Sequence, residues 1–384
     1  FFTMVAGFLS LILCLVFPVA SIAFWDYTGY DSFPTFFFGA NTTGLENLTQ
    51  TAFVSQFQIA GWGWQQDSDV TTAHEEVALA EAAVHLSDFV SAHPSASTQA
   101  IFVYRHAQLA LGWYDLSRAV WGQSDMFIKD RSGHVCMQPG SRGGPLWDFR
   151  SPETRTYWLE QIVGELVNES SITAAFFDET DQSYCGYNIS SATNCSNLEF
   201  KPTELQEMHR AKLTVLRETA AILNTHGKVP IFSSQNYLSH LRPDSCALPE
   251  EDMLAALNGT RWFRFYEFWD GDALDIRNAL AEGNLGVPFI AHTFPPPDGN
   301  MTYLVGMFYI VQSDYSYLGV SDGWTDPSWH WWPSYDVRCG KPRGPAQETA
   351  HGVWNRSFEE CEVMVDTNSQ QGRIDTHGHT FVKG

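Results

Sequence analysis

The segment TAAFFDETD, residues 173–181, carries an apolar, β-rich run that ends on acidic residues. Seven other short apolar runs occur along the chain, and helical patterns separate them. Parallel strands joined by helical crossovers produce this alternation, and eight such units favour a closed (β/α)8 barrel over an open doubly wound sheet, which stays the alternative. The predicted strands are Thr35–Gly39, Gln58–Trp62, Ile101–His106, Thr173–Asp178, Val229–Gln235, Trp262–Phe268, Val287–Thr293 and Tyr315–Val320.

The segments between these runs carry signals for helices. Ser151 precedes Pro152, which predicts an N-cap followed by proline at the first helical position. Thr203 with Gln206 fits a capping box and predicts another helix start. Within Trp158–Val167 the apolar residues recur at the spacing that a helix needs to pack on a sheet. We interpret these apolar residues as core.

Two shorter segments flank the predicted barrel. Residues 1–23 form an apolar leader that ends in the small-residue spacing of a signal-peptidase site, so we expect a signal peptide. An uncleaved leader that anchors the chain at the membrane is the alternative. The barrel is expected over 24–333. Residues 334–384 are rich in turn residues and alternate over Cys361–Asp366, which predicts a short β-rich extension packed on the barrel.

Potential glycosylation sites and cysteines favour secretion. Six of the seven cysteines lie outside the leader, an even set compatible with three disulfides, and we expect Cys185 to pair with Cys195 and Cys339 with Cys361. We therefore predict a secreted glycoprotein. The N-x-Ser/Thr sequences that support this prediction begin at Asn41, Asn47, Asn168, Asn188, Asn194, Asn258, Asn300 and Asn355.

The charge of the chain excludes several kinds of partner. Its 44 acidic and 22 basic residues give a formal net charge of -22, which repels phosphate backbones and anionic lipid headgroups. The sequence also has no G-x-S-x-G elbow, no H-E-x-x-H, no P-loop and no complete G-x-G-x-x-G. We expect no nucleic acid partner, no cofactor and a monomeric protein.

Acidic residues follow two of the predicted strands. Asp178 ends the fourth strand, and Glu267 follows the sixth in RWFRFYEFWD. Barrel enzymes place catalytic groups where strands end, and glycoside hydrolysis needs one ionised and one protonated carboxyl group at a shared cleft. We therefore predict Asp178 as nucleophile and Glu267 as acid/base. The alternative is that either one is a structural acid paired with Arg105 or Arg264.

Strand alternation bears on where these two acids point. If Asp178 faces the barrel axis, Phe176 faces it too, which is sterically reasonable. For Glu267 two registers stay open. An inward Glu267 goes with Phe265 and puts Arg264 against the helices, whereas the opposite register puts Arg264 inside the barrel and Glu267 at its rim.

A sugar site also needs flat aromatic surfaces for C–H faces and polar groups for hydroxyls. Candidates of both kinds follow the predicted strands. Asp178, Glu179 and Asp181 together could hold a hard cation such as Ca2+ or Mg2+, although we assign no metal site. The predicted substrate-binding residues are Trp62, Trp64, Arg105, His106, Glu179, Asp181, Asn236, Trp269, His292 and Trp324.

Three stretches point to a known group of proteins: VYRHA at the third strand, WDFRSPETRTYWLEQI leading into FFDETD, and WNRSFEECEVMVD in the tail. Over about Thr35–Ile374 the chain resembles uncharacterised glycoside-hydrolase-like barrel proteins. The resemblance implies a barrel strand that ends in Asp178 and tail strands beside the barrel. In similar, better understood retaining barrels, a nucleophilic Asp ends the fourth strand and an acid/base carboxylate ends the sixth, positions that match Asp178 and Glu267. Several such families have Asp where this chain has Glu267.

The sequence thus leads to a secreted glycosidase that acts on extracellular carbohydrate, with retention of anomeric configuration. Two alternatives stay open. One is a carbohydrate-binding barrel without turnover, and the other is a cation-dependent hydrolase that uses the FDETD cluster.

Overall fold

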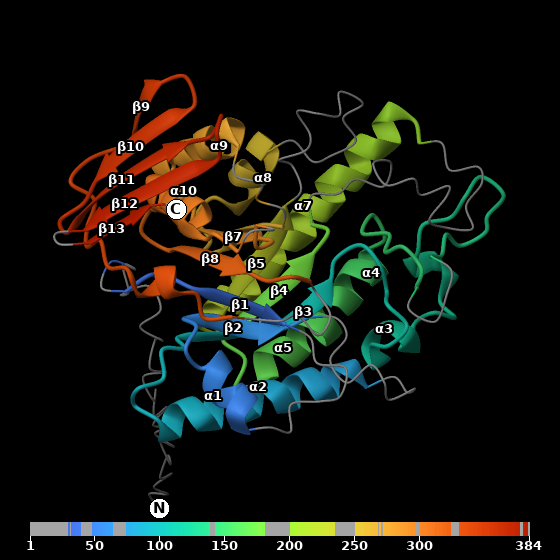
Figure 1. Ribbon diagram of the computed structural model, residues 1–384. Helices are drawn as coiled ribbons and strands as arrows, with labels where there is room; N and C mark the ends of the chain where they lie inside the picture. The colour runs from blue at the N-terminus through green and yellow to red at the C-terminus, as the bar shows by residue number, and fades with distance from the viewer. Residues whose placement is uncertain are drawn as a thin grey trace, which may run out of the picture.

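A (β/α)8 barrel forms the body of the protein (Figure 1). Its eight parallel strands are hydrogen-bonded in sequence order, and a bridge between Thr35 and Leu318 joins the first strand to the eighth. The predicted fold class and the positions of all eight predicted strands are confirmed. The strands are β1 Phe36–Gly39, β2 Ile59–Trp62, β3 Ala100–His106, β4 Ala174–Asp178, β5 Val229–Ser234, β6 Phe263–Tyr266, β7 Phe289–Thr293 and β8 Ser316–Val320.

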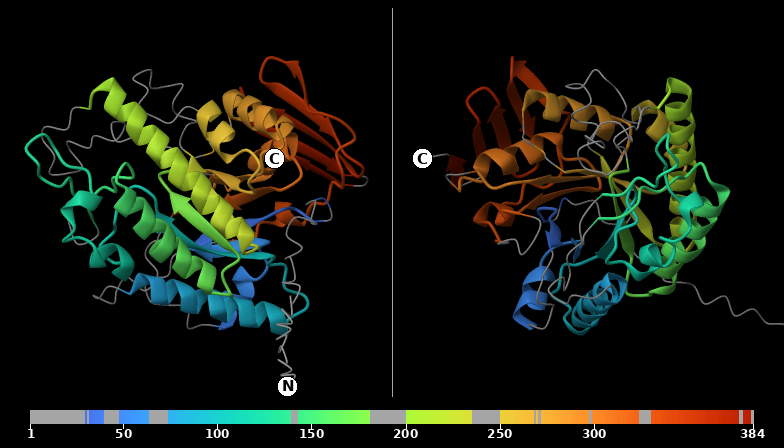
Figure 2. Two further views of the ribbon diagram at one scale, coloured as in Figure 1. Left: turned by 180° about the vertical axis from the view of Figure 1, so that it is seen from behind. Right: turned by 90° about the vertical axis from the view of Figure 1, so that its right-hand side faces the viewer.

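The computed structural model describes most of the chain. Helices lie outside the strands and cover the barrel (Figure 2). The described residues are 30, 32–39, 48–63, 74–138, 143–180, 200–234, 250–267, 269, 272–296, 299–323, 330–376 and 379–382. The helices are α1 Leu48–Val54, α2 Glu75–Ala92, α3 Asp115–Ala119, α4 Pro152–Tyr157, α5 Gly164–Asn168, α7 Pro202–Thr225, α8 Glu250–Leu257, α9 Ala273–Asn284 and α10 Thr302–Val311.

One predicted helix start is confirmed and another is wrong. The Ser151 hydroxyl accepts a hydrogen bond from the Thr154 N–H at 3.3 Å, with proline at the first turn of α4. A π-helical segment, Trp158–Val163, then joins α4 to α5. Helix α7 begins at Pro202 rather than after Thr203, because the ring preorganises the first turn and the Glu204 carboxylate accepts the Lys201 N–H at 2.7 Å.

Phenylalanine rings fill the barrel interior. Phe36 stacks on Phe102 with ring centroids 5.3 Å apart, and Phe176 meets Phe265 edge to face at 4.8 Å. Burial of each such side chain contributes about 1.5–3 kcal/mol. These contacts also identify the inward face of each strand, since residues two apart on a strand share a face.

The register of β6, which the sequence left open, follows from its charged and aromatic residues. Arg264 is buried and pairs with Glu282 of α9 at 3.0 Å, and the Tyr266 hydroxyl donates to the same carboxylate. Both side chains therefore face the helices, whereas Phe265 faces the barrel axis. The next position in this inward phase is Glu267.

The C-terminal extension is a five-stranded antiparallel sheet that packs on α10 outside the barrel (Figures 1 and 2). Along Cys361–Asp366, Val363 and Val365 are buried while Glu362 and Met364 are exposed, so the predicted alternation is confirmed. The strands, in the sheet order β13-β12-β11-β10-β9, are β9 Gln347–Ala350, β10 Val353–Ser357, β11 Cys361–Asp366, β12 Gln371–Thr376 and β13 His379–Val382.

A disulfide fastens this extension. Cys339 bonds to Cys361 at the start of β11, which confirms the predicted pair. Cys136 is buried and is likewise disulfide-bonded. The other predicted pair, Cys185 with Cys195, lies outside the described residues. Within the described part of the chain, every helix is too short or too polar to cross a membrane, and the leader lies outside that part.

Candidate active site

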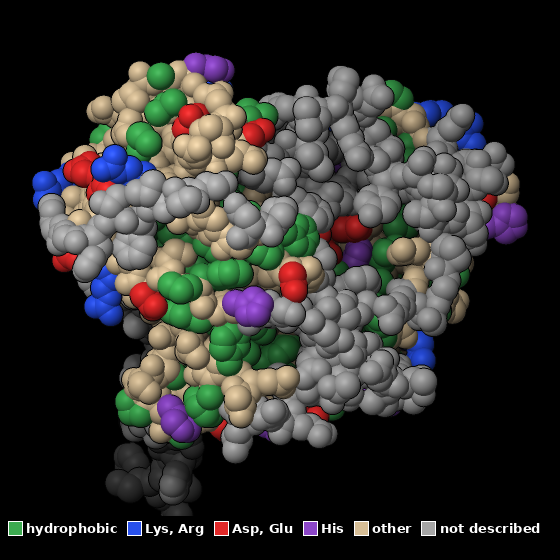
Figure 3. Space-filling view, viewed as in Figure 1, with side chains coloured by type: hydrophobic (Ala, Val, Ile, Leu, Met, Phe, Trp, Pro, Cys, Tyr) green, Lys and Arg blue, Asp and Glu red, His purple; other side chains and the backbone are tan. Residues whose placement is uncertain are grey.

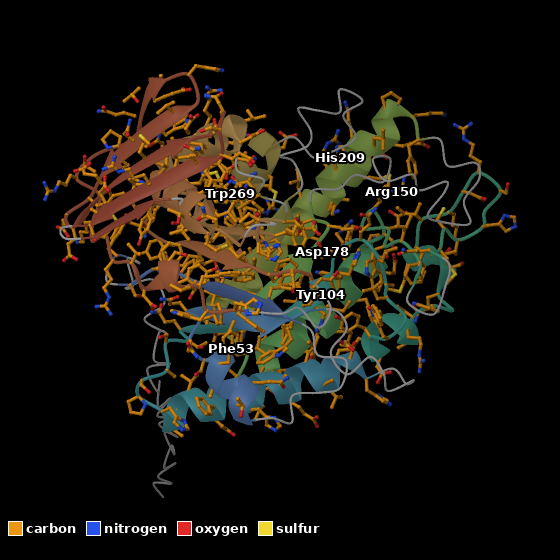
Figure 4. The ribbon with its side chains drawn as sticks, in the orientation of Figure 1. Phe53, Tyr104, Arg150, Asp178, His209 and Trp269 are labelled. Carbon is orange, nitrogen blue, oxygen red and sulfur yellow. A yellow bond between two sulfur atoms is a disulfide. The ribbon has the colours of Figure 1, made fainter. Side chains whose placement is uncertain are left out.

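Asp178 is half-buried at the C-terminal end of β4, the end at which barrel enzymes place their catalytic groups. Figure 4 shows it beside Tyr104 of β3, near the centre of the barrel. In the space-filling view this face is hollowed near its centre, with acidic and histidine side chains visible at the bottom of the hollow (Figure 3). We take this end of the barrel as the candidate active site.

Two donors hold the Asp178 carboxylate. Its Oδ2 accepts a hydrogen bond from the Tyr104 hydroxyl at 2.6 Å, and its Oδ1 accepts the Glu179 N–H at 2.8 Å. Burial and the neighbouring Asp178 raise the pKa of Tyr104 well above its usual value, so the phenol keeps its proton and acts as a donor. The carboxylate is thus fixed in orientation through both oxygens.

His106, two residues after Tyr104 on β3, is the next inward side chain. Its Nδ1 accepts the N–H groups of Gln108 at 3.2 Å and Leu109 at 3.0 Å, so Nε2 carries the ring proton. Nε2 lies 3.5 Å from the Glu179 carboxylate. Burial lowers the pKa of His106 to about 4, so the ring is neutral at neutral pH and offers one N–H at the site.

The turn after Asp178 is held by two neighbouring elements. Glu179 has a left-handed φ of 53°, a conformation that costs a non-glycine residue about 1–3 kcal/mol. Lys212 of α7, almost fully buried, donates from Nζ to the Glu179 carbonyl at 2.5 Å. The Thr180 hydroxyl donates to the Ser233 carbonyl of β5. These contacts offset the strain and place the Glu179 N–H on Asp178.

Glu267 directly follows β6 and is partly exposed. Its carbonyl lies 3.1 Å from Nδ1 of His292, which is fully buried on β7. Burial lowers the pKa of His292 to about 3. On the other side of the ring, Nε2 lies 2.8 Å from the Ser321 hydroxyl, which itself donates to the Gly323 carbonyl at 2.9 Å. His292 therefore holds the exit of β6 and has no exposed surface for a ligand.

Asp178 and Glu267 occupy equivalent places on their strands. The rings of Phe176 and Phe265 touch across the barrel, and each acid is the next inward position after its phenylalanine. Each acid therefore comes one inward position after the contact between these two phenylalanine rings, towards the C-terminal end of the barrel. This arrangement suits a pair of carboxylates that face one ligand.

Three predicted binding residues lie elsewhere. Arg105 lies between Tyr104 and His106, which take the inward positions of β3, so its side chain faces the helices. There its guanidinium pairs with Glu165 at 2.5 Å. Trp62 is buried on the face of β2 opposite Gly61, where a Cβ would collide with inward Phe102. The third, Trp269, is 1% exposed beside α10. These three side chains form part of the core.

Of the other predicted binding residues, His106 and Glu179 lie together beside Asp178. Among the described residues no group of three or more His, Cys, Asp and Glu side chains is placed to hold a metal ion. Four predicted residues lie outside the described part of the chain, namely Trp64, Asp181, Asn236 and Trp324.

Two cavities lie at the opposite end of the barrel. One, of about 430 Å3, includes Asp314, and the other, of about 380 Å3, includes Leu285. Both are lined by residues that precede β7 and β8, and neither touches Asp178 or Glu267. Since the amino-terminal end of a barrel serves stability rather than catalysis, we keep the candidate site at the carboxyl end.

The sequence reasoning missed Tyr104 and Lys212. Tyr104 could have been found by the alternation that was applied to Asp178, because His106 and Tyr104 pair in register with Asp178 and Phe176. No local signal marks Lys212, which reaches the site from the middle of α7.

Fold and site together define a (β/α)8-barrel protein with carboxylates at the exits of its fourth and sixth strands. No protein-family model and no curated protein matches the sequence. Among solved structures, the chain is similar to an α-N-acetylgalactosaminidase, NagBb from Bifidobacterium bifidum, in a quadruple mutant form. The TM-score is 0.51 at 10% identity, over 92% of this chain and 58% of that one.

Two further solved structures are more distantly similar. The Flavobacterium johnsoniae GH31 dextranase complexed with glucose gives a TM-score of 0.48 at 10% identity, over 77% of this chain and 36% of that chain. The Aspergillus fumigatus protein Ega3 complexed with galactosamine gives 0.39 at 8% identity, over 72% and 80% respectively. At these identities the comparison with NagBb bears on the fold alone.

Proposed function

We propose that this protein is a retaining glycoside hydrolase that acts on an extracellular carbohydrate. The observation that carries the proposal is the Asp178 carboxylate, held through both oxygens at the barrel mouth, with Glu267 in the matching inward phase of β6. Two carboxyl groups on separate strands are the minimal machinery for glycosidic bond cleavage. The reaction needs no cofactor.

Each residue then has a defined role. Asp178 attacks the anomeric carbon while Glu267 gives its proton to the departing glycosidic oxygen, which leaves a glycosyl ester on Asp178. Glu267, now ionised, takes a proton from water, and the water oxygen displaces Asp178 from the anomeric carbon. The His106 N–H and the Glu179 carboxylate beside Asp178 supply a donor and an acceptor for sugar hydroxyls.

The Cys339–Cys361 disulfide supports an oxidising compartment, and with it the proposal that the protein is secreted. α-N-Acetylgalactosaminides are the first substrates to test, because NagBb, which shares the fold, is named for that activity. Aryl glycosides of the other common hexoses and a panel of polysaccharides complete the screen.

Paired substitutions test the two acids. Asp178→Asn should abolish hydrolysis, since the amide is no nucleophile, with an unchanged melting temperature. Glu267→Gln should slow substrates with poor leaving groups by about 10²–10⁴-fold and spare activated aryl glycosides, which need no proton. Release of aryl alcohol and of reducing sugar measures both. Full activity of Asp178→Asn would remove Asp178 from the mechanism, and sugar binding by the wild-type chain without turnover would favour a binding barrel.

A further inference from the structure

The side chain of Tyr104 contacts the carboxylate of Asp178. It lies on β3 in the inward phase, is 3% exposed, and stacks on Phe176 with ring centroids 5.7 Å apart. Its hydroxyl reaches Asp178 Oδ2 at 2.6 Å, the distance of a charge-assisted hydrogen bond. The rigid strand and the stacked ring fix the direction of this bond.

Packing alone does not account for a tyrosine at this position. The Tyr104 ring lies against the rings of Phe38, Phe176 and His106, and a phenylalanine ring would make the same contacts. A buried hydroxyl is costly unless it is hydrogen-bonded, so phenylalanine would serve packing equally well. The partner of this hydroxyl is the Asp178 carboxylate.

The charged groups around Asp178 show what the hydroxyl offsets. The next residue, Glu179, brings a second carboxylate, which opposes negative charge on Asp178. His106 is neutral, and Lys212 donates to the Glu179 carbonyl. The Tyr104 hydroxyl donates its hydrogen bond directly to one carboxylate oxygen of Asp178.

We propose that Tyr104 is a positioning residue that stabilises the Asp178 carboxylate as it leaves the sugar. This inference rests on the proposed hydrolase function. When the glycosyl ester forms, Asp178 loses its negative charge and the hydrogen bond from Tyr104 weakens. When water displaces Asp178, the electron pair of the C–O bond returns to the carboxylate, and the hydrogen bond regains its strength. Tyr104 therefore accelerates the second step.

The variant Tyr104→Phe tests this role in the full chain. A lost hydrogen bond to a charged group corresponds to about a 10- to 100-fold slower release of Asp178. We expect kcat and KM to fall together on p-nitrophenyl glycosides, with a burst of p-nitrophenol as the ester accumulates. A purely structural residue would not produce the burst.

Tyr114→Phe is the matched control. Tyr114 is equally buried, but its hydroxyl donates to the backbone carbonyl of Tyr104 at 3.2 Å. This variant should keep the wild-type kcat, KM and pH profile. 3-Fluorotyrosine at position 104 keeps the ring and strengthens the donor, so it should raise the rate of ester breakdown even if Tyr104→Phe folds poorly.

The outcomes separate this inference from the proposed function. If Asp178→Asn abolishes activity while Tyr104→Phe retains the wild-type kcat and KM and shows no burst, Tyr104 has no positioning role and the hydrolase proposal stands. If the wild-type chain cleaves none of the glycosides in the screen, or Asp178→Asn keeps full activity, both proposals fail.

Discussion

Two neutral histidines lie on β3 and β7, next to the strands that carry the proposed catalytic acids. His106 presents its N–H beside Glu179, and His292 is enclosed between the Glu267 carbonyl and the Ser321 hydroxyl. The His106 ring cannot take up a proton without loss of a favourable contact, since its Nδ1 accepts two backbone N–H groups. Their neutrality is a consequence of burial.

This burial makes stability depend on pH. The pKa values of His106 and His292 are lowered from 6.5 to about 4 and about 3. Below pH 6.5 the unfolded chain binds protons that the folded chain refuses, so the free energy of unfolding falls as the pH falls towards 4. By pH 4.5 we expect a loss of about 2–3 kcal/mol for each histidine. Urea unfolding at pH 7 and pH 4.5 measures it.

Two variants serve as controls for this prediction. His292→Asn keeps a donor at the Glu267 carbonyl and has no titrating ring, so it should show a shallower pH dependence. His226→Gln, at an exposed position at the end of α7, is the matched control. An identical pH dependence in wild type and His292→Asn would contradict the account.

Sequence reasoning identified only some of the site residues. An acid after an apolar strand predicts Asp178 and Glu179, and a polar residue at the end of the third strand predicts His106, which lies beside them. Arg105 was selected because it is polar and near a strand end, but alternation turns it towards Glu165. Tyr104 was missed because an aromatic residue within an apolar strand looks like core.

At the level of elements, α7 supports the exit of β4. Lys212 extends from the middle of this helix to the Glu179 carbonyl, behind the residue whose N–H binds Asp178. A second buried lysine, Lys228, precedes β5 and donates to the Leu166 and Ile172 carbonyls at the other end of the barrel. The chain thus offers two similar lysines at opposite ends.

Substitution of these lysines separates stability from function. Lys212→Met and Lys228→Met each leave buried carbonyls without their donor, and each should cost about 1–3 kcal/mol in the free energy of unfolding. Lys212→Met alone should also lower kcat, because the turn at Glu179 no longer orients Asp178. Denaturant unfolding and rates measured well below the melting temperature test this. Equal kcat values in both variants would refute a role for α7 at the site.

The positions of the strands could be predicted from the sequence, but the direction of Glu267 and the start of α7 could not. Short apolar runs between helical patterns mark parallel strands well, since such strands are buried on both faces. The side to which Glu267 points could not be derived from the sequence, because alternation allowed both registers. The Arg264–Glu282 pair decides it through a helix distant in sequence. The start of α7 was misplaced because Thr203 imitates a cap that Lys201 and Glu204 provide.

At the level of the whole molecule, barrel closure brings the exits of β4 and β6 to one end. The C-terminal sheet packs on α10 outside the barrel, and a disulfide fastens it (Figure 1). The alternation over Cys361–Asp366 predicts the sheet, and the presence of two cysteines in this segment led us to expect the disulfide, although connectivity cannot be read from sequence. The position of these two strand exits at one end is a long-range property, and the sequence indicates it only through the barrel topology.

Covalent trapping tests the central claim, that Asp178 is the nucleophile. The full chain is incubated with 5-fluoroglycosyl fluorides of N-acetylgalactosamine, glucose and galactose, digested, and analysed by peptide mass spectrometry. We predict one added glycosyl unit, located on Asp178 and absent from the Asp178→Asn variant. A glycosyl unit on another residue, or none from a chain that hydrolyses the corresponding glycosides, would contradict the account.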